Sequence, residues 1–371
     1  MITPNKKRVE SDLLHLSQFR DPAFSGITRR FDSKYYVDAR NWLIEKITGY
    51  GLSPLIDETG NLIVEYGGHK KKKVIATGSH TDTVIGGGRY DGTIGVIGGL
   101  EVLRCCIEND IELSNNIFLI DFFAEESTDF GISTIGSRGL TGTLTREQLA
   151  LTNKKGKTLD EIISLHKNML NAKSSTIDRN RISYFIELHI EQGPILESKN
   201  KKIGIVLGIT GLRRIEVVIE GESNHAGTTP LSLRRDAYLP AAEVAIKLRE
   251  EWKKSDDDSL RITIGSINIT PNLSNVIPGR TEFSIDLRAN SNETLDYWIL
   301  QVEKVLNQSC LQHHVEGKAA LKSRIEPVIF DNDVLDVLSK VTNESSTSSL
   351  TLNSGAVHDS SQMSLISKTG M

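Results

Sequence analysis

The chain has 371 residues, 38% of them hydrophobic and 25% charged, and carries a net charge of −4 at pH 7. This length favours two domains, and the composition is typical of a soluble globular protein without a strongly basic nucleic-acid surface. No apolar run approaches the roughly 18 residues of a membrane span. Because Cys105, Cys106 and Cys310 form no CxxC motif or disulfide framework, and no secretory signal opens the chain, we expect a cytoplasmic protein.

The first part of the chain alternates helical and strand-like patterns, which indicates an α/β sheet covered by helices. The lysine run Lys70–Lys73 lies between two of the strands, and we interpret it as a solvated hairpin tip rather than a binding patch. The last strand-like run is almost continuously apolar, as expected of a strand buried on both faces. The expected elements are helices at 7–19, 34–50 and Gly95–Asn109, and strands at Asn61–Tyr66, Val74–Thr77 and Asn116–Ala124.

The pattern changes near residue 204, where glycine mixes with β-branched residues in a strand-like composition. The following β-α-β-β-α order suggests a compact α+β insert, after which helical spacing returns at Asp333–Val341. The insert's expected elements are strand-like residues 204–222, a helix at Ala237–Lys253, strands at Arg261–Ile269 and Thr281–Arg288, and a helix at Thr294–Gln308.

A histidine and an aspartate follow the strand-like run Val74–Thr77, in Gly78-Ser79-His80-Thr81-Asp82. The carboxyl end of a strand is where open α/β sheets bind ligands. The imidazole of His80 suits zinc, manganese or cobalt, and Asp82 could accept the other ring N–H and fix the tautomer. Taken alone, the pair is a weak signal, and a solvated loop histidine is the favoured interpretation.

Two later segments contribute carboxylates. Gly86-Gly87-Gly88-Arg89-Tyr90-Asp91-Gly92 allows close backbone approach, and the two oxygens of Asp91 could bridge two cations, although a plain turn also fits. A phosphate loop is disfavoured because no Gly-Lys-Ser/Thr follows. At the end of the apolar run, Glu125 and Glu126 could divide the work of metal ligand and general base, with a solvated strand end as the alternative.

The fourth segment is Glu187-Leu188-His189-Ile190-Glu191-Gln192-Gly193. Alternation along a strand would place Glu187, His189 and Glu191 on one face, where His189 could complete a metal site. A histidine without a ligand is the alternative for this segment alone. Four such segments, each after or within a strand-like run, argue jointly for a metal centre.

Together with further motifs, these segments resemble a known family. The motifs are GSHTDTV, GGRYDGTIGV, DFFAEES with DFGISTIGSRGLTG, ELHIEQGPILE, GESNHAGTTP, NLSNVIPG and DLR. In this order they resemble the hydantoinase/carbamoylase-type amidase branch of the aminoacylase/carboxypeptidase-like dinuclear metallohydrolases. That branch contains N-carbamoyl-L-amino acid hydrolases, β-ureidopropionase and allantoate amidohydrolase.

The resemblance implies a role for each candidate residue. His80 and His189 would be terminal ligands of one metal, Asp91 the bridging ligand, Glu126 a ligand of the second metal, and Glu125 the general base. The residues assigned to substrate are Gln192, Asn275, Arg288 and His358, together with His225, which the partner subunit would contribute to stabilise the oxyanion. Arg288 would hold a substrate carboxylate in bidentate fashion. From the residues alone, Arg288 could be a surface ion pair, His225 a turn histidine and Asn275 a cap.

The resemblance also implies the architecture and the partners. It predicts an α/β catalytic domain with a mixed sheet flanked by helices, formed by residues 1–206 and 325–371. Residues 207–324 would form an inserted α+β domain with a four-stranded sheet and two helices, through which the protein makes a homodimer. The expected cofactors are two divalent ions per subunit, of zinc, manganese, cobalt or nickel, and the expected partner is a small-molecule substrate, with no nucleic acid and no membrane.

The chain departs from the family pattern near its C-terminus. The family's Gly-x-Ser-His-type motif supplies a histidine to the metal shared by Asp91 and Glu126, and none of the nine histidines here follows such a motif. His358 instead lies in Ser354-Gly355-Ala356-Val357-His358-Asp359, which resembles an earlier substrate-binding motif, with Val357 in place of glycine. We therefore expect a catalytic domain truncated at its C-terminus, a weakened second metal site and reduced activity.

The reaction implied is hydrolysis of a linear ureido or amide C–N bond in a small carboxylate substrate. An N-carbamoyl-L-amino acid would give the amino acid, ammonia and carbon dioxide, with Glu125 transferring the proton of the attacking water to the leaving nitrogen. The alternatives are allantoate amidohydrolase activity and, from another class, a dimeric ligand-binding relative without catalysis.

Overall fold

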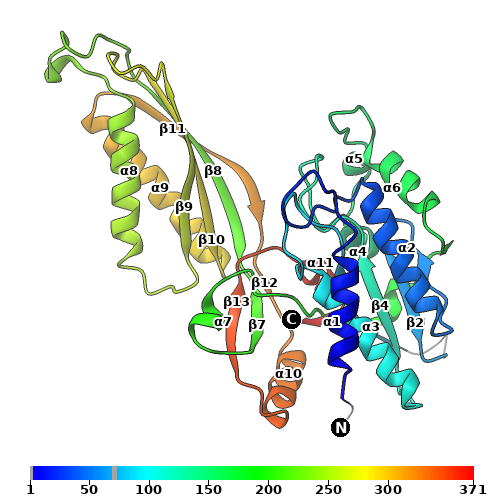
Figure 1. The fold of residues 1–371 in the computed structure, drawn as a ribbon. Coiled ribbons are helices and arrows are strands. Elements are labelled where there is room, and N and C mark those ends of the chain that lie inside the picture. The colour runs from blue at the N-terminus through cyan, green and yellow to red at the C-terminus, as the bar shows by residue number, and fades with distance from the viewer. Residues whose placement is uncertain (1–2, 69–72) are drawn as a thin grey trace. The chain divides into compact units, whose positions relative to one another are not determined.

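The computed structural model describes residues 3–68 and 73–371, which divide into two compact units (Figure 1). The first unit comprises Met1–Leu207, Phe330–Leu352 and Val357–Met371, and the second comprises Gly208–Ile329 and Asn353–Ala356. The expected lysine hairpin tip falls outside the described residues except for Lys73. The assignment of a catalytic domain and a dimerisation domain stays a prediction.

The first unit is built on a seven-stranded mixed sheet in the order β14-β6-β3-β4-β2-β1-β5. Strands β3, β4, β6 and β14 run parallel, whereas β2 is antiparallel to both β4 and β1. The strands are β1 (Leu55–Ile56), β2 (Leu62–Tyr66), β3 (Val74–His80), β4 (Asn116–Phe122), β5 (Lys173–Ser174), β6 (Ile182–Ile186) and β14 (Lys368–Gly370).

Helices cover both faces of this sheet because β4 carries apolar side chains on both sides. Leu119 packs with helices α1, α2 and α3 on one face, and Phe118, Ile120 and Phe122 pack with α4 and α11 on the other. All four side chains are at most 2% exposed, which confirms the strand buried on both faces. The helices of this unit are α1 (Lys6–Leu16), α2 (Lys34–Thr48), α3 (Thr93–Glu108), α4 (Ile135–Thr141), α5 (Arg146–Leu149), α6 (Leu159–Asn168), η1 (Arg179–Arg181), α7 (Ile195–Ser198), α10 (Asn332–Glu344) and α11 (Asp359–Met363).

The second unit is a four-stranded antiparallel sheet, in the order β11-β8-β10-β9, with helices α8 and α9 on one face (Figure 1). Alternate residues of β10, including Phe283, Ile285 and Leu287, pack against Val244 of α8 and Trp298 of α9. The elements are β8 (Gly211–Glu220), η2 (Leu231–Leu233), α8 (Tyr238–Trp252), β9 (Arg261–Thr270), β10 (Arg280–Ala289), α9 (Asn292–Gln312) and β11 (Glu316–Ile325). The predicted fold class, a mixed sheet flanked by helices plus an α+β insert with four strands and two helices, is confirmed.

A small three-stranded sheet, β12-β7-β13, lies where the chain passes from one unit to the other. Its strands are β7 (Ile203–Ile209), β12 (Val328–Ile329) and β13 (Ser349–Ser354). Among the helices formed by residues 3–68 and 73–371, none has both the length and the apolar character needed to cross a bilayer.

One expectation about the strands is wrong. Strand β6 ends at Ile186, so Glu187, His189 and Glu191 do not share a strand face. The chain turns away after Glu187, and the Glu191 carboxylate accepts the backbone N–H groups of Ile195 and Leu196 at 2.6 and 2.7 Å, at the start of α7. Satisfying these helix-terminal donors separates Glu191 from its two neighbours.

A buried histidine beneath the sheet makes the stability of this unit depend on pH. His166 of α6 is 2% exposed, stacks on the Tyr36 ring and lies with Nε2 2.9 Å from an Arg40 terminal nitrogen. Burial, and then the charge of Arg40, hold the pKa of His166 well below its ordinary value. The unfolded chain therefore binds a proton near pH 6.5 that the folded chain does not bind.

We expect the free energy of unfolding to be highest above pH 6.5 and to fall as the pH drops below it, by up to about 1.4 kcal/mol per pH unit from this group. Urea titrations at several pH values between 7.5 and 5.5 measure the slope. His166→Gln should give a shallower slope than the parent protein, whereas His314→Asn, in the exposed turn that follows α9, should not. Equal slopes in all three proteins would contradict the assignment.

Candidate metal centre

His80 is the last residue of β3, at the carboxyl edge of the parallel strands. Its Nδ1 lies 3.1 Å from the Asp82 carbonyl oxygen, so this nitrogen carries a proton, and Nε2 is the ring atom that faces Asp91 and Glu125. The side chain of Asp82 also lies beside this ring, with Oδ1 3.4 Å from His80 Nδ1, and its two oxygens accept the backbone N–H groups of Glu125 and Glu126 at 3.2 and 3.1 Å. Asp82 thus ties the end of β3 to the glutamate pair that follows β4.

Asp91 and His189 complete a group with His80. Nδ1 of His189 lies 2.9 Å from the Ile190 carbonyl oxygen, which leaves the buried Nε2 as the ring nitrogen that faces Asp91. Asp91 Oδ1 lies 3.2 Å from His189 Nε2 and 4.0 Å from His80 Nε2. The two ring nitrogens and Asp91 Oδ1 thus face one another, and imidazole nitrogen and carboxylate oxygen are atoms that a divalent cation binds.

Glycine is required where the Asp91 loop passes His80. A Cβ on Gly92 would lie 2.5 Å from atoms of the His80 ring, and its backbone has φ +62°. The glycine-rich segment therefore does bring backbone against the site, as its sequence suggested. The Gln192 side-chain amide donates to both oxygens of Asp91, at 3.1 and 2.9 Å, so this predicted substrate residue also covers the carboxylate.

Glu125 and Glu126 form a second group with His80, whose Nε2 lies 3.5 Å from Glu125 Oε2. Ala124, the residue before Glu125, has a φ of +50°, a left-handed conformation that is uncommon for a residue other than glycine. Burial raises the pKa of Glu125 well above its ordinary range, against the opposing charge of His80, and raises the pKa of Glu126 to about 7.

The donor set fits a divalent metal. Imidazole and carboxylate groups suit zinc, manganese, cobalt and nickel. Three candidate ligand groups are found among the described residues: His80 with Asp91 and His189, His80 with Glu125 and Glu126, and His189 with Glu187 and His358. His80 therefore joins the first group to the second, and His189 joins the first to the third. Burial disfavours the ionised forms of Glu125 and Glu126, and a cation beside these two carboxylates would offset that penalty.

Two further buried carboxylates, which were not assigned a role from the sequence, and the predicted substrate residue His358 border the centre. Glu187 is buried and accepts from Ser79 Oγ and the Ser360 backbone N–H, both at 2.8 Å. Asp359 accepts from Ser137 Oγ at 2.5 Å, and burial raises the pKa of this carboxyl well above its usual value. His358 is 3% exposed, and its ring centroid lies 4.4 Å from that of His189. The structure therefore places His358 beside a proposed metal ligand.

The remaining candidates belong to the second unit, where two of them are neighbours. His225 and Val276 form a bridge, and Ala226 N–H donates to the Asn275 carbonyl at 3.0 Å. His225 Nδ1 accepts Gly227 N–H at 3.1 Å, so the neutral ring keeps its proton on Nε2 and exposes a donor. This is the group that an oxyanion requires.

Arg288 lies at the far end of β10 from this pair. Strand β10 begins at Arg280, which pairs with Glu220, whereas Arg288 pairs with Leu212 near the start of β8. The guanidinium of Arg288 contacts Asp286 and the Gly355 carbonyl.

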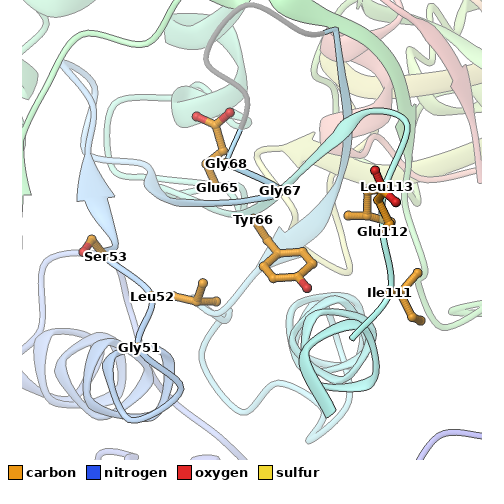
Figure 2. A pocket seen from close by; sticks show the side chains of 10 residues that line it. All are labelled: Gly51, Leu52, Ser53, Glu65, Tyr66, Gly67, Gly68, Ile111, Glu112 and Leu113. Atoms are coloured by element: carbon orange, nitrogen blue, oxygen red, sulfur yellow. The ribbon is translucent and has the colours of Figure 1, made fainter. Parts of the chain in front are cut away.

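A surface hollow of about 480 Å³ in the first unit, shown in Figure 2, lies away from the candidate metal centre. Tyr66 stands among its lining residues and pairs with Ile117 at the start of β4, whereas His80 pairs with Phe122 at the end of that strand. The hollow therefore lies at the opposite edge of the sheet from the candidate centre and contains none of the candidate residues.

The chain matches a known protein family over most of its length. Residues 74–371 match peptidase family M20/M25/M40. The chain is 34% identical over 348 residues to allantoate amidohydrolase of Bacillus subtilis, covering 93% of this chain and 84% of that protein. It is 31% identical over 370 residues to N-carbamoyl-L-amino-acid amidohydrolase of Paenarthrobacter aurescens, covering 98% and 89%.

A crystal structure of a hydantoinase/carbamoylase family amidase from Burkholderia multivorans matches with a TM-score of 0.92 and 27% identity, covering 100% of this chain and 90% of that one. The chain therefore belongs to the peptidase M20/M25/M40 family and, within it, to the hydantoinase/carbamoylase-type amidases, hydrolases of C–N bonds in linear amides.

Proposed function

We propose that this protein hydrolyses the ureido bond of N-carbamoyl-L-amino acids, giving the amino acid, ammonia and carbon dioxide. The observation that carries the proposal is the convergence of His80, Asp91, His189 and the pair Glu125–Glu126 at one edge of the sheet. These side chains come from four separate segments. Packing of the core would not by itself favour a cluster of so many ionisable groups.

Two divalent cations held by these side chains would supply a water of lowered pKa and a Lewis acid for the substrate carbonyl oxygen. Glu125 takes the proton of the attacking water and delivers it to the nitrogen as the C–N bond breaks. His225 donates its Nε2–H to the oxyanion. Arg288 binds the substrate carboxylate, and Gln192, Asn275 and His358 complete the substrate contacts.

The second unit supports a site shared between two copies of the chain. His225 adjoins the Arg280 end of β10, and Arg288 lies eight residues further along the same strand. At about 3.3 Å per residue the two ends are about 26 Å apart, more than a small amino-acid derivative can span. We therefore propose a homodimer in which His225 and Arg288 of different subunits act on one substrate.

Ammonia release tests the proposal. The purified protein, freed of metal by chelation, should release no ammonia from N-carbamoyl-L-alanine, and manganese or zinc should restore release. Allantoate is the second candidate substrate, because the Bacillus subtilis relative with 34% identity is an allantoate amidohydrolase. Faster release from allantoate would replace the first candidate by the second. Ligand binding without release from either compound, at full metal occupancy, would instead identify a non-catalytic relative.

A further inference from the structure

The guanidinium of Arg288 is held in place by its own strand. Arg288 and Asp286 lie two residues apart on β10, on the sheet face opposite helices α8 and α9. Arg288 Nε donates to Asp286 Oδ1 at 2.8 Å, one terminal nitrogen donates to Asp286 Oδ2 at 3.4 Å, and the other donates to the Gly355 carbonyl at 2.5 Å. Since a guanidinium has five N–H groups, one remains on each terminal nitrogen.

Positive charge is concentrated around this one carboxylate. Arg214 stands opposite Asp286 on β8 and donates to its Oδ2 at 3.2 Å. Arg261 stands opposite Arg288 on β9, with its own guanidinium bonded to the Asp258 and Leu260 carbonyls. Like charges directly opposite one another destabilise a sheet, so the pairing of Arg261 with Arg288 is not explained by the stability of the fold. At the Arg288 end of this face, three arginines therefore lie on neighbouring strands around one aspartate, an arrangement suited to binding an anion.

We propose that Asp286 is the positioning residue for Arg288, holding its two remaining N–H groups as a fork for the carboxylate of the substrate. The inference rests on the proposed role of Arg288 in substrate binding. An arginine side chain loses substantial rotamer freedom when it is fixed, and a partner that fixes it beforehand removes that cost from binding. The fork geometry then matches both carboxylate oxygens at once.

Asp286 also has an opposite effect, because its negative charge weakens the attraction of Arg288 for an anion. The Arg288 side chain is 37% exposed and that of Asp286 22%, so solvent and salt screen this repulsion. The loss of orientation is not screened. The geometric effect is therefore the larger, and removing Asp286 should weaken substrate binding.

Steady-state kinetics on the metal-loaded enzyme test this. Asp286→Ala should raise the KM for N-carbamoyl-L-alanine by about 10–100-fold and change kcat by no more than about twofold, as expected of a misplaced binding group. Asp286→Asn keeps one acceptor for the Arg288 Nε–H and should raise the KM by no more than about threefold. The primary amide of the same compound has no carboxylate, and its KM should not respond to either variant.

Glu216→Ala is the matched control, because Glu216 lies on the same face of β8, pairs with Lys322 at 3.2 Å and does not contact Arg288. It should leave the KM unchanged. If both Asp286 variants and Glu216→Ala lower the KM, charge dominates and the positioning role is refuted. If Arg288→Ala raises the KM while Asp286→Ala does not, only the positioning role fails. An unchanged KM in Arg288→Ala removes the proposed function of Arg288 and this inference with it.

Discussion

Glu125→Gln is expected to abolish turnover while leaving the metal centre and substrate binding intact. Glu125 is buried at the end of β4, 3.5 Å from His80 Nε2, and its backbone is fixed by Asp82, so the side chain is set toward the space that the metals and the water would share. Glutamine keeps the volume and the acceptor oxygen but cannot carry a proton. Loss of a general base typically lowers kcat by a factor of about 10²–10⁴.

The measurement combines ammonia release with metal content and calorimetric binding of N-carbamoyl-L-alanine. In Glu125→Gln only the first should fall. Glu58→Gln, a substitution of the same kind at an exposed position, is the control and should match the parent protein in all three. If Glu125→Gln retains kcat within a few-fold of the parent, another group acts as the base. If its metal content falls in proportion to kcat, Glu125 is a ligand instead.

The candidate centre could be predicted from the sequence because its residues follow rules that are local. Strand β4 is identified by its apolar run, and the carboxyl ends of parallel strands meet at one edge, so His80 and the pair Glu125–Glu126 had to come close. The separation of Glu191 from His189 could not be predicted, since the alternating pattern continues past the point where β6 stops.

Strand β11 is a strand that the sequence pattern did not predict. Its sequence, EGKAALKSRI, is largely polar with no apolar run, and most of its side chains are exposed, so the sequence pattern alone did not indicate a strand. It is held by pairing with β8, a contact between residues about a hundred positions apart in the chain. The fourth strand of the insert was expected only from the family resemblance.

One residue in the sequence indicates a buried ion pair. Asp121 stands alone in the apolar run of β4, and an isolated carboxylate in a buried strand requires a partner. The partner is Arg40 of α2, whose Nε donates to Asp121 Oδ2 at 2.8 Å, and both side chains are at most 1% exposed. Which arginine would fill the role could not be predicted, because the two residues lie 81 positions apart.

The buried Arg40–Asp121 pair is expected to make a large contribution to the stability of the fold. Arg40 also donates to the carbonyls of Asp121 and Gly60, and Thr81 Oγ1 donates to Asp121 Oδ2 at 3.0 Å. Asp121→Asn leaves a buried guanidinium without its counter-charge, a change that typically costs about 3–5 kcal/mol. We expect a loss of this size in the free energy of unfolding, measured by urea titration. Asp129→Asn breaks the exposed Arg30–Asp129 pair instead and should cost at most about 1 kcal/mol.

The double variant Arg40→Met with Asp121→Asn separates the pair's own contribution from the penalty of an unpaired charge. Because no buried charge is then left without a partner, we expect it to be more stable than Asp121→Asn alone, which would show as a coupling energy in the double-mutant cycle.

Thr81→Val is a milder variant that removes only one hydrogen bond from Asp121, and it can be measured even if the larger changes prevent folding. Since Thr81 lies between His80 and Asp82, this milder variant should also weaken metal binding, whereas Asp129→Asn should not. If the changes in the free energy of unfolding of the single variants add up to that of the double variant, Arg40 and Asp121 are not coupled. If Thr81→Val leaves the metal affinity unchanged, the ion pair does not support the metal centre.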